Sequence, residues 1–196
     1  MEKFLEATKS GIVCRIGIES VIFKTPLMAN PSKIEQRRLE DLDGLFRDKE
    51  AYGKAEKQKL IYSIYYFDFA FNGLSCAVTE MLPGKIGEEY YFTKGHFHKP
   101  PEASETYIVL HGNGIVILQH EDNEKPILIA PFSRGMVVFT PPYYGHRVVN
   151  IGSGKLYWIS IFNTGVELNY EKILKEGFKV SVVEKDGKAT FIENIN

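Results

Sequence analysis

The sequence predicts an all-β protein, a sandwich or a barrel, with a few short helices. From residue 60 onwards, short stretches rich in β-branched and aromatic residues alternate with turn signals. Their spacing of about 8 to 12 residues is typical of antiparallel sheets rather than of βαβ units. The chain also contains 11 Tyr and 13 Phe among its 196 residues. Most of these fall within the same stretches, and aromatic residues favour strands.

The first 58 residues are expected to flank the barrel rather than to build it. A strand is predicted at Gly11–Ile18 and another around Val21–Phe23, where β-branched residues are frequent. Residues 32–58 are charged and interrupted by glycines. The best position for a short helix in this part runs from Ser32, as a possible N-cap, to about Leu42.

A series of short strands is predicted next, each bounded by glycine, proline, asparagine or aspartate. These strands cover residues 60–67, 74–82, 89–93, 105–110, 114–120, 126–129, 136–140, 146–150 and 156–162. Asn169 to Lys175 has the pattern of one or two helical turns stopped by Gly177. A hairpin through Lys185–Lys188 closes the chain, because Asp-Gly favours a tight turn.

Length and charge indicate a single domain and argue against several classes of function. A chain of 196 residues is most simply one domain, here residues 1–196. Its 24 basic and 25 acidic residues form no basic stripe that would favour nucleic acid or an anionic membrane. No stretch has the length of a signal peptide's apolar core or of a transmembrane span. We therefore expect a cytoplasmic protein.

The strongest functional signal is a group of three histidines and one glutamate. His96 and His98 stand two positions apart on strand-like sequence, so their side chains share a face while Phe97 points to the other. Two prolines then force a turn, and the next strand starts at Glu105. His146 opens a later strand after a second pair of prolines. This pattern can bring all four side chains to one point.

Three imidazole nitrogens and one carboxylate oxygen are a ligand set for a divalent transition metal. They leave one or two coordination positions for water or substrate, which is the arrangement of a catalytic rather than a structural site. Mixed nitrogen and oxygen ligation suits Fe²⁺, Mn²⁺, Ni²⁺ or Zn²⁺ and does not choose among them. His111 and His120 lack such neighbours, and we expect them to be structural or solvent-facing.

The combined motifs resemble the cupin superfamily of small β-barrels, and within it the cupin-type (archaeal-type) phosphoglucose isomerases. The likeness rests on TKGHFH at residues 93–98, on Glu105, and on PPYYGHRVVN at residues 141–150. It runs from about Tyr62 to the terminal hairpin and is faint over residues 1–58. The resemblance implies a jelly-roll-like double-stranded β-helix over residues 59–196, including the C-terminal helix and hairpin.

The resemblance also implies roles for individual residues. One divalent metal per subunit would be held by His96, His98, Glu105 and His146, with iron expected first and manganese, nickel or zinc as alternatives. Catalysis would involve Glu105 and Tyr107. A sugar phosphate would contact Tyr62, Thr79, Thr93, Gly95 and Tyr170. Phe162 stands where the family has a tyrosine and Leu168 where it has a histidine, so affinity or specificity is expected to differ.

The implied activity is the interconversion of glucose 6-phosphate and fructose 6-phosphate in glycolysis and gluconeogenesis. Hydrogen must move between C1 and C2 while charge develops on the carbonyl oxygen, which a divalent ion can stabilise. If a cis-enediolate forms, a base must shuttle the proton, and Glu105 is the carboxylate in the motif. A metal-assisted hydride shift would need no base. The sequence leaves both routes open.

Two other interpretations also stay open. The chain could be another metal-dependent cupin enzyme, either an oxygenase or an isomerase of a different sugar, or a cupin that binds a sugar or metal without turnover. The hydroxyl groups of Thr79 and Thr93 argue against the apolar pocket expected of an oxygenase. No DNA-binding segment is present to support a sensor.

Strand alternation makes two further predictions. Lys94 and Arg147 each stand next to an inward-facing ligand, so they are expected to face away from the metal, on the outer face or at a subunit contact. Several strands look apolar on both faces, with Ile108 opposing Tyr107 and Ile159 opposing Trp158. One face can fill the barrel while the other is covered by a partner, so we expect a homodimer.

Overall fold

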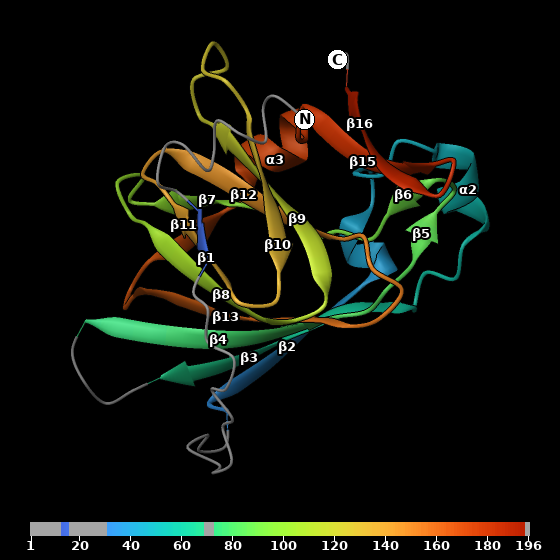
Figure 1. Cartoon of the computed structure of the whole chain (residues 1–196). Coiled ribbons are helices and arrows are strands. Elements are labelled where there is room, and N and C mark those ends of the chain that lie inside the picture. Colours follow the sequence, from blue (N-terminus) through green and yellow to red (C-terminus); the bar gives the residue numbers. More distant parts are fainter. Residues whose placement is uncertain (1–12, 16–30, 69–72, 195–196) are drawn as a thin grey trace.

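The computed structural model describes residues 13–15, 31–68 and 73–194, and in this part of the chain nearly all regular structure is β (Figure 1). The described helices are short: the 3₁₀ helix η1 (Leu39–Leu42), α2 (Lys49–Lys54) and α3 (Glu171–Glu176). The predicted all-β barrel with a few short helices is confirmed. None of the described helices has both the length and the apolar character needed to cross a membrane.

The barrel is built mainly from a large sheet and a small sheet. The large, seven-stranded sheet is ordered β1 (Val13–Arg15), β11 (Met136–Thr140), β8 (Glu105–His111), β13 (Leu156–Asn163), β4 (Leu74–Met81), β3 (Leu60–Asp68) and β2 (Lys33–Arg38). The small sheet has the order β10 (Leu128–Ser133), β9 (Asn113–His120) and β12 (Tyr144–Asn150). All neighbouring strands in both sheets are antiparallel.

Two smaller sheets complete the described part of the fold. One pairs β14 (Glu167–Asn169) with β7 (Phe97–Lys99). The other has the order β16 (Lys188–Glu193), β15 (Val180–Lys185), β6 (Glu89–Tyr90) and β5 (Lys85–Ile86). The last strands of the chain therefore lie beside the segment that leads into the histidine motif (Figure 1).

The core lies between the two main sheets. Strand β9 is buried from Gly114 to Gln119, and Phe132 and Trp158 pack edge to face across the interior with ring centroids 5.5 Å apart. Aromatic pairs of this geometry stabilise a core by more than their buried area alone. Trp158 also borders the cavity that holds the candidate site.

The predicted helix from Ser32 to Leu42 is wrong over most of its length. Lys33–Arg38 is strand β2, the edge of the large sheet, paired with β3. Only the 3₁₀ turn at Leu39–Leu42 is helical. An edge strand tolerates charged residues on both faces, so Lys33–Arg38 lacks the apolar alternation by which strands are recognised. The α-helix of this region lies further on, at Lys49–Lys54, where the Asp48 side chain accepts a hydrogen bond from the Ala51 N–H.

Most other predicted elements are found, with shifted ends. The predicted strand 89–93 is regular only at Glu89–Tyr90, although Phe92 still bridges to Val149. The C-terminal helix ends as predicted at Gly177, and the hairpin through Lys185–Lys188 is present. Of the predicted strand 11–18, residues 13–15 are strand β1. The other residues of that strand, and the strand at 21–23, lie outside the described residues.

Candidate metal centre

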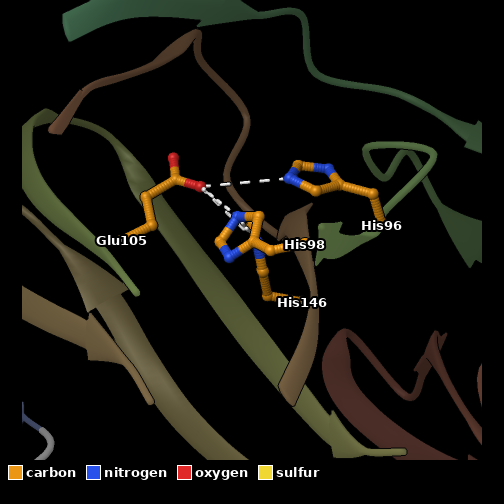
Figure 2. A group of neighbouring side chains, drawn as sticks. All are labelled: His96, His98, Glu105 and His146. Carbon is orange, nitrogen blue, oxygen red and sulfur yellow. Dashed lines mark hydrogen bonds and ion pairs between the residues drawn. The ribbon is translucent and has the colours of Figure 1, made fainter. Parts of the chain in front are cut away.

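The four predicted metal ligands come from three parts of the barrel that meet at one point. His98 belongs to β7, Glu105 begins β8, and His146 lies in β12. His96 precedes β7 and pairs with His146 through two backbone hydrogen bonds, of 3.3 Å from its own N–H and 3.0 Å from that of His146. Figure 2 shows the four side chains directed toward one another.

Their ligand atoms form a compact cluster. One potential ligand atom from each residue lies within 4.8 Å of all the others. Glu105 Oε2 is 3.3 Å from His98 Nε2, 3.5 Å from His146 Nε2 and 3.9 Å from His96 Nε2. The Nε2 atoms of His98 and His146 are 3.3 Å apart. These separations match donors arranged around a common centre rather than pairs that satisfy one another.

In His98 and His146, the ring nitrogen that faces away from the cluster, Nδ1, makes a hydrogen bond. The Ala103 carbonyl oxygen lies 3.2 Å from His98 Nδ1, so Nδ1–H donates there and leaves the Nε2 lone pair facing the cluster. His146 Nδ1 is hydrogen-bonded to the Tyr107 hydroxyl. Such partners orient metal-binding histidines and set their tautomer. His96 Nε2 is buried and has no hydrogen-bond partner within the described residues, as expected of a nitrogen whose lone pair is reserved for an ion.

Burial keeps the imidazoles of His96 and His146 neutral. It is the main cause that lowers the pKa of His96 to about 3, and the neighbouring His98 adds to the effect. Burial, together with the nearby imidazoles, also holds the pKa of His146 well below its usual range. A neutral imidazole is the form that binds metal. Three imidazole nitrogens and one carboxylate around an open point fit a divalent transition metal.

A cavity of about 340 Å³ opens onto this cluster. Its floor is the inner face of the large sheet, where the register places residues in rows across the strands. One row runs Tyr107, Ser160, Ala77, Tyr66, Lys33, and the next runs Trp158, Thr79, Ile64, Glu35. The metal ligands therefore lie at one side of the cavity and strand β2 at the other.

All the substrate contacts implied by the resemblance border this same cavity: Tyr62, Thr79, Thr93, Gly95, Tyr107 and Tyr170. Their convergence from separate strands and loops agrees with a binding site. Phe162 and Leu168 also border it, so apolar side chains occupy the positions where the family has a tyrosine and a histidine.

The loop between β6 and β7 brings Thr93 and Gly95 to the cavity. Gly95 has φ = 76°, a conformation that side chains disfavour. A Cβ at this position would also lie 2.5 Å from the Phe178 ring and 2.9 Å from the His146 carbonyl oxygen. Glycine is therefore required at position 95 for the backbone to pass this close to the ligand strand.

Sequence reasoning missed the contribution of β2. Lys33 and Glu35 border the cavity, and Glu35 Oε2 is 2.7 Å from the Arg37 guanidinium. The assignment of this segment to a helix concealed the inward alternation of residues 33, 35 and 37. Lys94 and Arg147 do not border the cavity, and His111 and His120 lie outside the metal cluster.

Comparisons with known proteins identify the family of the chain. The family model described as glucose-6-phosphate isomerase matches residues 36–196. The chain belongs to the glucose-6-phosphate isomerase family. It is 37% identical to the glucose-6-phosphate isomerase of Thermococcus kodakarensis over 161 residues, which cover 81% of this chain and 84% of that protein. It is 35% identical to the glucose-6-phosphate isomerase of Pyrococcus furiosus over 179 residues, covering 89% and 93%.

A solved structure with a related shape is the Lactobacillus farciminis oxalate decarboxylase formate complex. It has a TM-score of 0.44 and 22% identity, and the match covers 52% of this chain and 28% of that one. The assignment to the glucose-6-phosphate isomerase family rests on the sequence matches alone. All four candidate metal ligands fall within the segment that the family model matches.

The contact between Tyr107 and His146 makes a prediction for metal affinity. If Nε2 of His146 holds an ion, its Nδ1 carries the hydrogen and donates a hydrogen bond to the Tyr107 hydroxyl oxygen. Tyr107→Phe removes this acceptor and should weaken Ni²⁺ binding by roughly 10- to 100-fold, measured by calorimetric titration of the metal-free protein.

The matched control for this measurement is Tyr157→Phe, which removes a hydroxyl from the outer face of the large sheet and should leave Ni²⁺ affinity unchanged. Equal affinity in Tyr107→Phe and the unaltered protein would mean that Tyr107 does not orient His146.

Proposed function

We propose that the protein interconverts glucose 6-phosphate and fructose 6-phosphate with one bound divalent metal ion. The observation that carries the proposal is the cluster of three imidazoles and one carboxylate at one side of a cavity lined with hydroxyl groups. The chain's membership of the glucose-6-phosphate isomerase family supports the same substrates. Iron is the proposed ion, since the ligand set suits it, as it does manganese, nickel and zinc.

The isomerisation moves a hydrogen between C1 and C2 of the sugar. The bound ion would supply Lewis-acid stabilisation of the charge that develops on the sugar oxygens. Glu105 directs Oε2 at the imidazoles, whereas its other oxygen points away from them (Figure 2). That second oxygen, Oε1, is placed to accept a proton from the substrate. Burial raises the pKa of Tyr107 well above its usual range, so its hydroxyl stays protonated and can orient a sugar oxygen.

The phosphate group would be bound by neutral donors. Thr93 Oγ1 accepts a hydrogen bond of 3.0 Å from the Val148 N–H, which leaves its own hydrogen to donate into the cavity. Thr79 is buried on the floor of the cavity, two strands from Tyr107. With Phe162 and Leu168 apolar, fewer donors face the phosphate than the family pattern provides. We infer that binding relies more heavily on Thr79, Thr93 and the Gly95 N–H.

The outer face of the large sheet supports a homodimer. Half-buried or exposed apolar side chains form one row across six strands, in the order Val137, Ile108, Ile159, Val78, Tyr65 and Ile34. Ile34, at the edge of this row, is 55% exposed. A large apolar row of this kind is normally covered in a soluble protein, and we infer that a second copy of the chain covers it.

From the proposed activity we also infer a role in glycolysis and gluconeogenesis and a location in the cytoplasm.

The isomerase activity is tested directly. Fructose 6-phosphate is supplied to the purified protein as isolated, after chelation with EDTA, and after addition of Fe²⁺, Mn²⁺, Ni²⁺ or Zn²⁺, and glucose 6-phosphate is measured. Activity should vanish with chelation and return with metal. His146→Ala should lose metal and activity together, because it removes one of the ligands. No turnover with any of the four ions in a metal-loaded site would refute the proposed reaction.

The phosphate contact makes a separate prediction. Thr93→Val keeps the shape of the side chain but removes the hydroxyl, so the KM for fructose 6-phosphate should rise about tenfold while the metal stays bound. Thr106→Val, on the outer face of β8, is the matched control and should leave the KM unchanged. An unaltered KM in Thr93→Val would remove this residue from the phosphate site.

The dimer is tested by light scattering after gel filtration. The unaltered protein should have twice the 22.3 kDa mass of one chain. Ile108→Arg places a charge in the middle of the apolar row and should yield monomers. A monomeric mass for the unaltered protein would contradict the proposed interface.

A further inference from the structure

Arg147 is a buried cation with no part in the cavity. It follows the metal ligand His146 on β12, and strand alternation turns it to the opposite side. The residue is 3% exposed. Its guanidinium carbon lies 4.2 Å from the centre of the Phe92 ring and 4.3 Å from that of the Phe178 ring. The sequence-based expectation that it faces away from the metal agrees with this position, but it lies in the interior rather than on an outer face.

Among the described residues, the guanidinium of Arg147 makes one hydrogen bond, to the loop that carries Thr93, Gly95 and His96. Its Nη2 donates a hydrogen bond of 3.0 Å to the Lys94 carbonyl oxygen. The Lys94 N–H, on the preceding peptide group, donates a bond of 3.2 Å to the Tyr62 hydroxyl. Both peptide groups that flank Lys94 are therefore held, one by Tyr62 beside the cavity and one by Arg147 behind it.

The rest of the loop has backbone restraints at its two ends. Thr93 donates a hydrogen bond of 2.8 Å to the Val148 carbonyl oxygen, and His96 is paired with His146. Between these points, Gly95 packs against Phe178, the same ring that stacks on Arg147. Arg147 thus supports the middle of the loop, where the backbone turns through the positive φ of Gly95.

Burying a guanidinium in this place is costly, and packing alone does not require it. Arg147 Nε has no hydrogen-bond partner within the described residues, and neither has Oε1 of Glu89, which is itself only 2% exposed. The Glu89 carboxylate interacts electrostatically with this guanidinium. An apolar side chain could fill the space between the two rings without this desolvation penalty. An apolar side chain could not supply a rigid N–H donor aimed at the Lys94 carbonyl oxygen.

We propose that Arg147 is a positioning residue whose guanidinium holds the Thr93–His96 loop in the geometry that both the metal and the substrate phosphate require. The phosphate part of this inference rests on the proposed function, whereas the metal part does not. Arg147 acts through the backbone of Lys94, and so it sets the placement of the Gly95 N–H, the Thr93 hydroxyl and the His96 imidazole together.

The test compares Arg147→Met, Arg147→Lys, Glu89→Gln and the double variant Arg147→Met/Glu89→Gln. Three quantities are measured for each: the Ni²⁺ dissociation constant by calorimetry, the KM and kcat at saturating metal, and the unfolding midpoint in urea. Arg147→Met should raise the Ni²⁺ dissociation constant and the KM by about tenfold each, with a smaller change in kcat. Arg147→Lys keeps the charge but loses the planar fork, and should shift both constants in the same direction.

Glu89→Gln separates a loop-holding role from simple charge balance. It retains an oxygen for the Arg47 N–H, which Glu89 Oε2 accepts at 2.9 Å, and it leaves the bond from Arg147 to Lys94 in place. Glu89→Gln alone should change neither the Ni²⁺ dissociation constant nor the KM. In the double variant no buried carboxylate is left uncompensated, so the urea midpoint should recover while the Ni²⁺ dissociation constant and the KM stay raised. Recovery of all three would overturn the proposal, because Arg147 would then serve only to neutralise Glu89.

The double variant also covers the case in which Arg147→Met alone does not fold, since it removes the unpaired carboxylate responsible. A lowered urea midpoint with unchanged Ni²⁺ affinity and KM in the folded Arg147 variants would likewise overturn the proposal. If the unaltered protein shows no isomerase activity, the proposed function fails. The Ni²⁺ dissociation constants then still decide whether Arg147 positions the loop.

Discussion

The site depends on one backbone contact, the antiparallel bridge between His96 and His146. It joins two motifs fifty residues apart in the chain. Because its two residues are themselves candidate ligands, the bridge fixes the distance between their Cα atoms before any ion binds. Glycine flanks the bridge on both strands: a Cβ at Gly145 would lie 2.7 Å from the Phe97 ring, just as one at Gly95 would meet Phe178. Close backbone approach, which only glycine permits there, is the constraint from which the ligand cluster follows.

The ligand set could be predicted from the sequence because strand alternation is a strong local rule. His96 and His98 had to share a side, and the prolines after them had to turn the chain toward Glu105. That Thr79, Thr93 and Tyr170 converge on the same cavity could be predicted only through the family resemblance. Residues so distant in sequence carry no local signal of proximity. Strand β2 was missed because its charged residues alternate without an apolar partner face, and only pairing with β3 makes it a strand.

Arg147 shows a different limit of sequence reasoning. Alternation correctly turns it from the metal, but it does not reveal what lies on the far side of β12. That side is covered by Phe178, which follows α3 and comes from a part of the chain remote from the motif. Whether an outward-facing residue meets solvent or a second layer of structure depends on the tertiary fold, and the same charged residue can therefore be a surface group or a buried donor.

The edge position of β2 has an evolutionary consequence. Lys33 and Glu35 lie on this strand and border the cavity on the side opposite the metal ligands. An edge strand has only one neighbour to satisfy, so its inward side chains can change without repacking the barrel. Divergence toward other phosphorylated sugars can then proceed by substitutions in residues 33–37 while the catalytic motif stays intact.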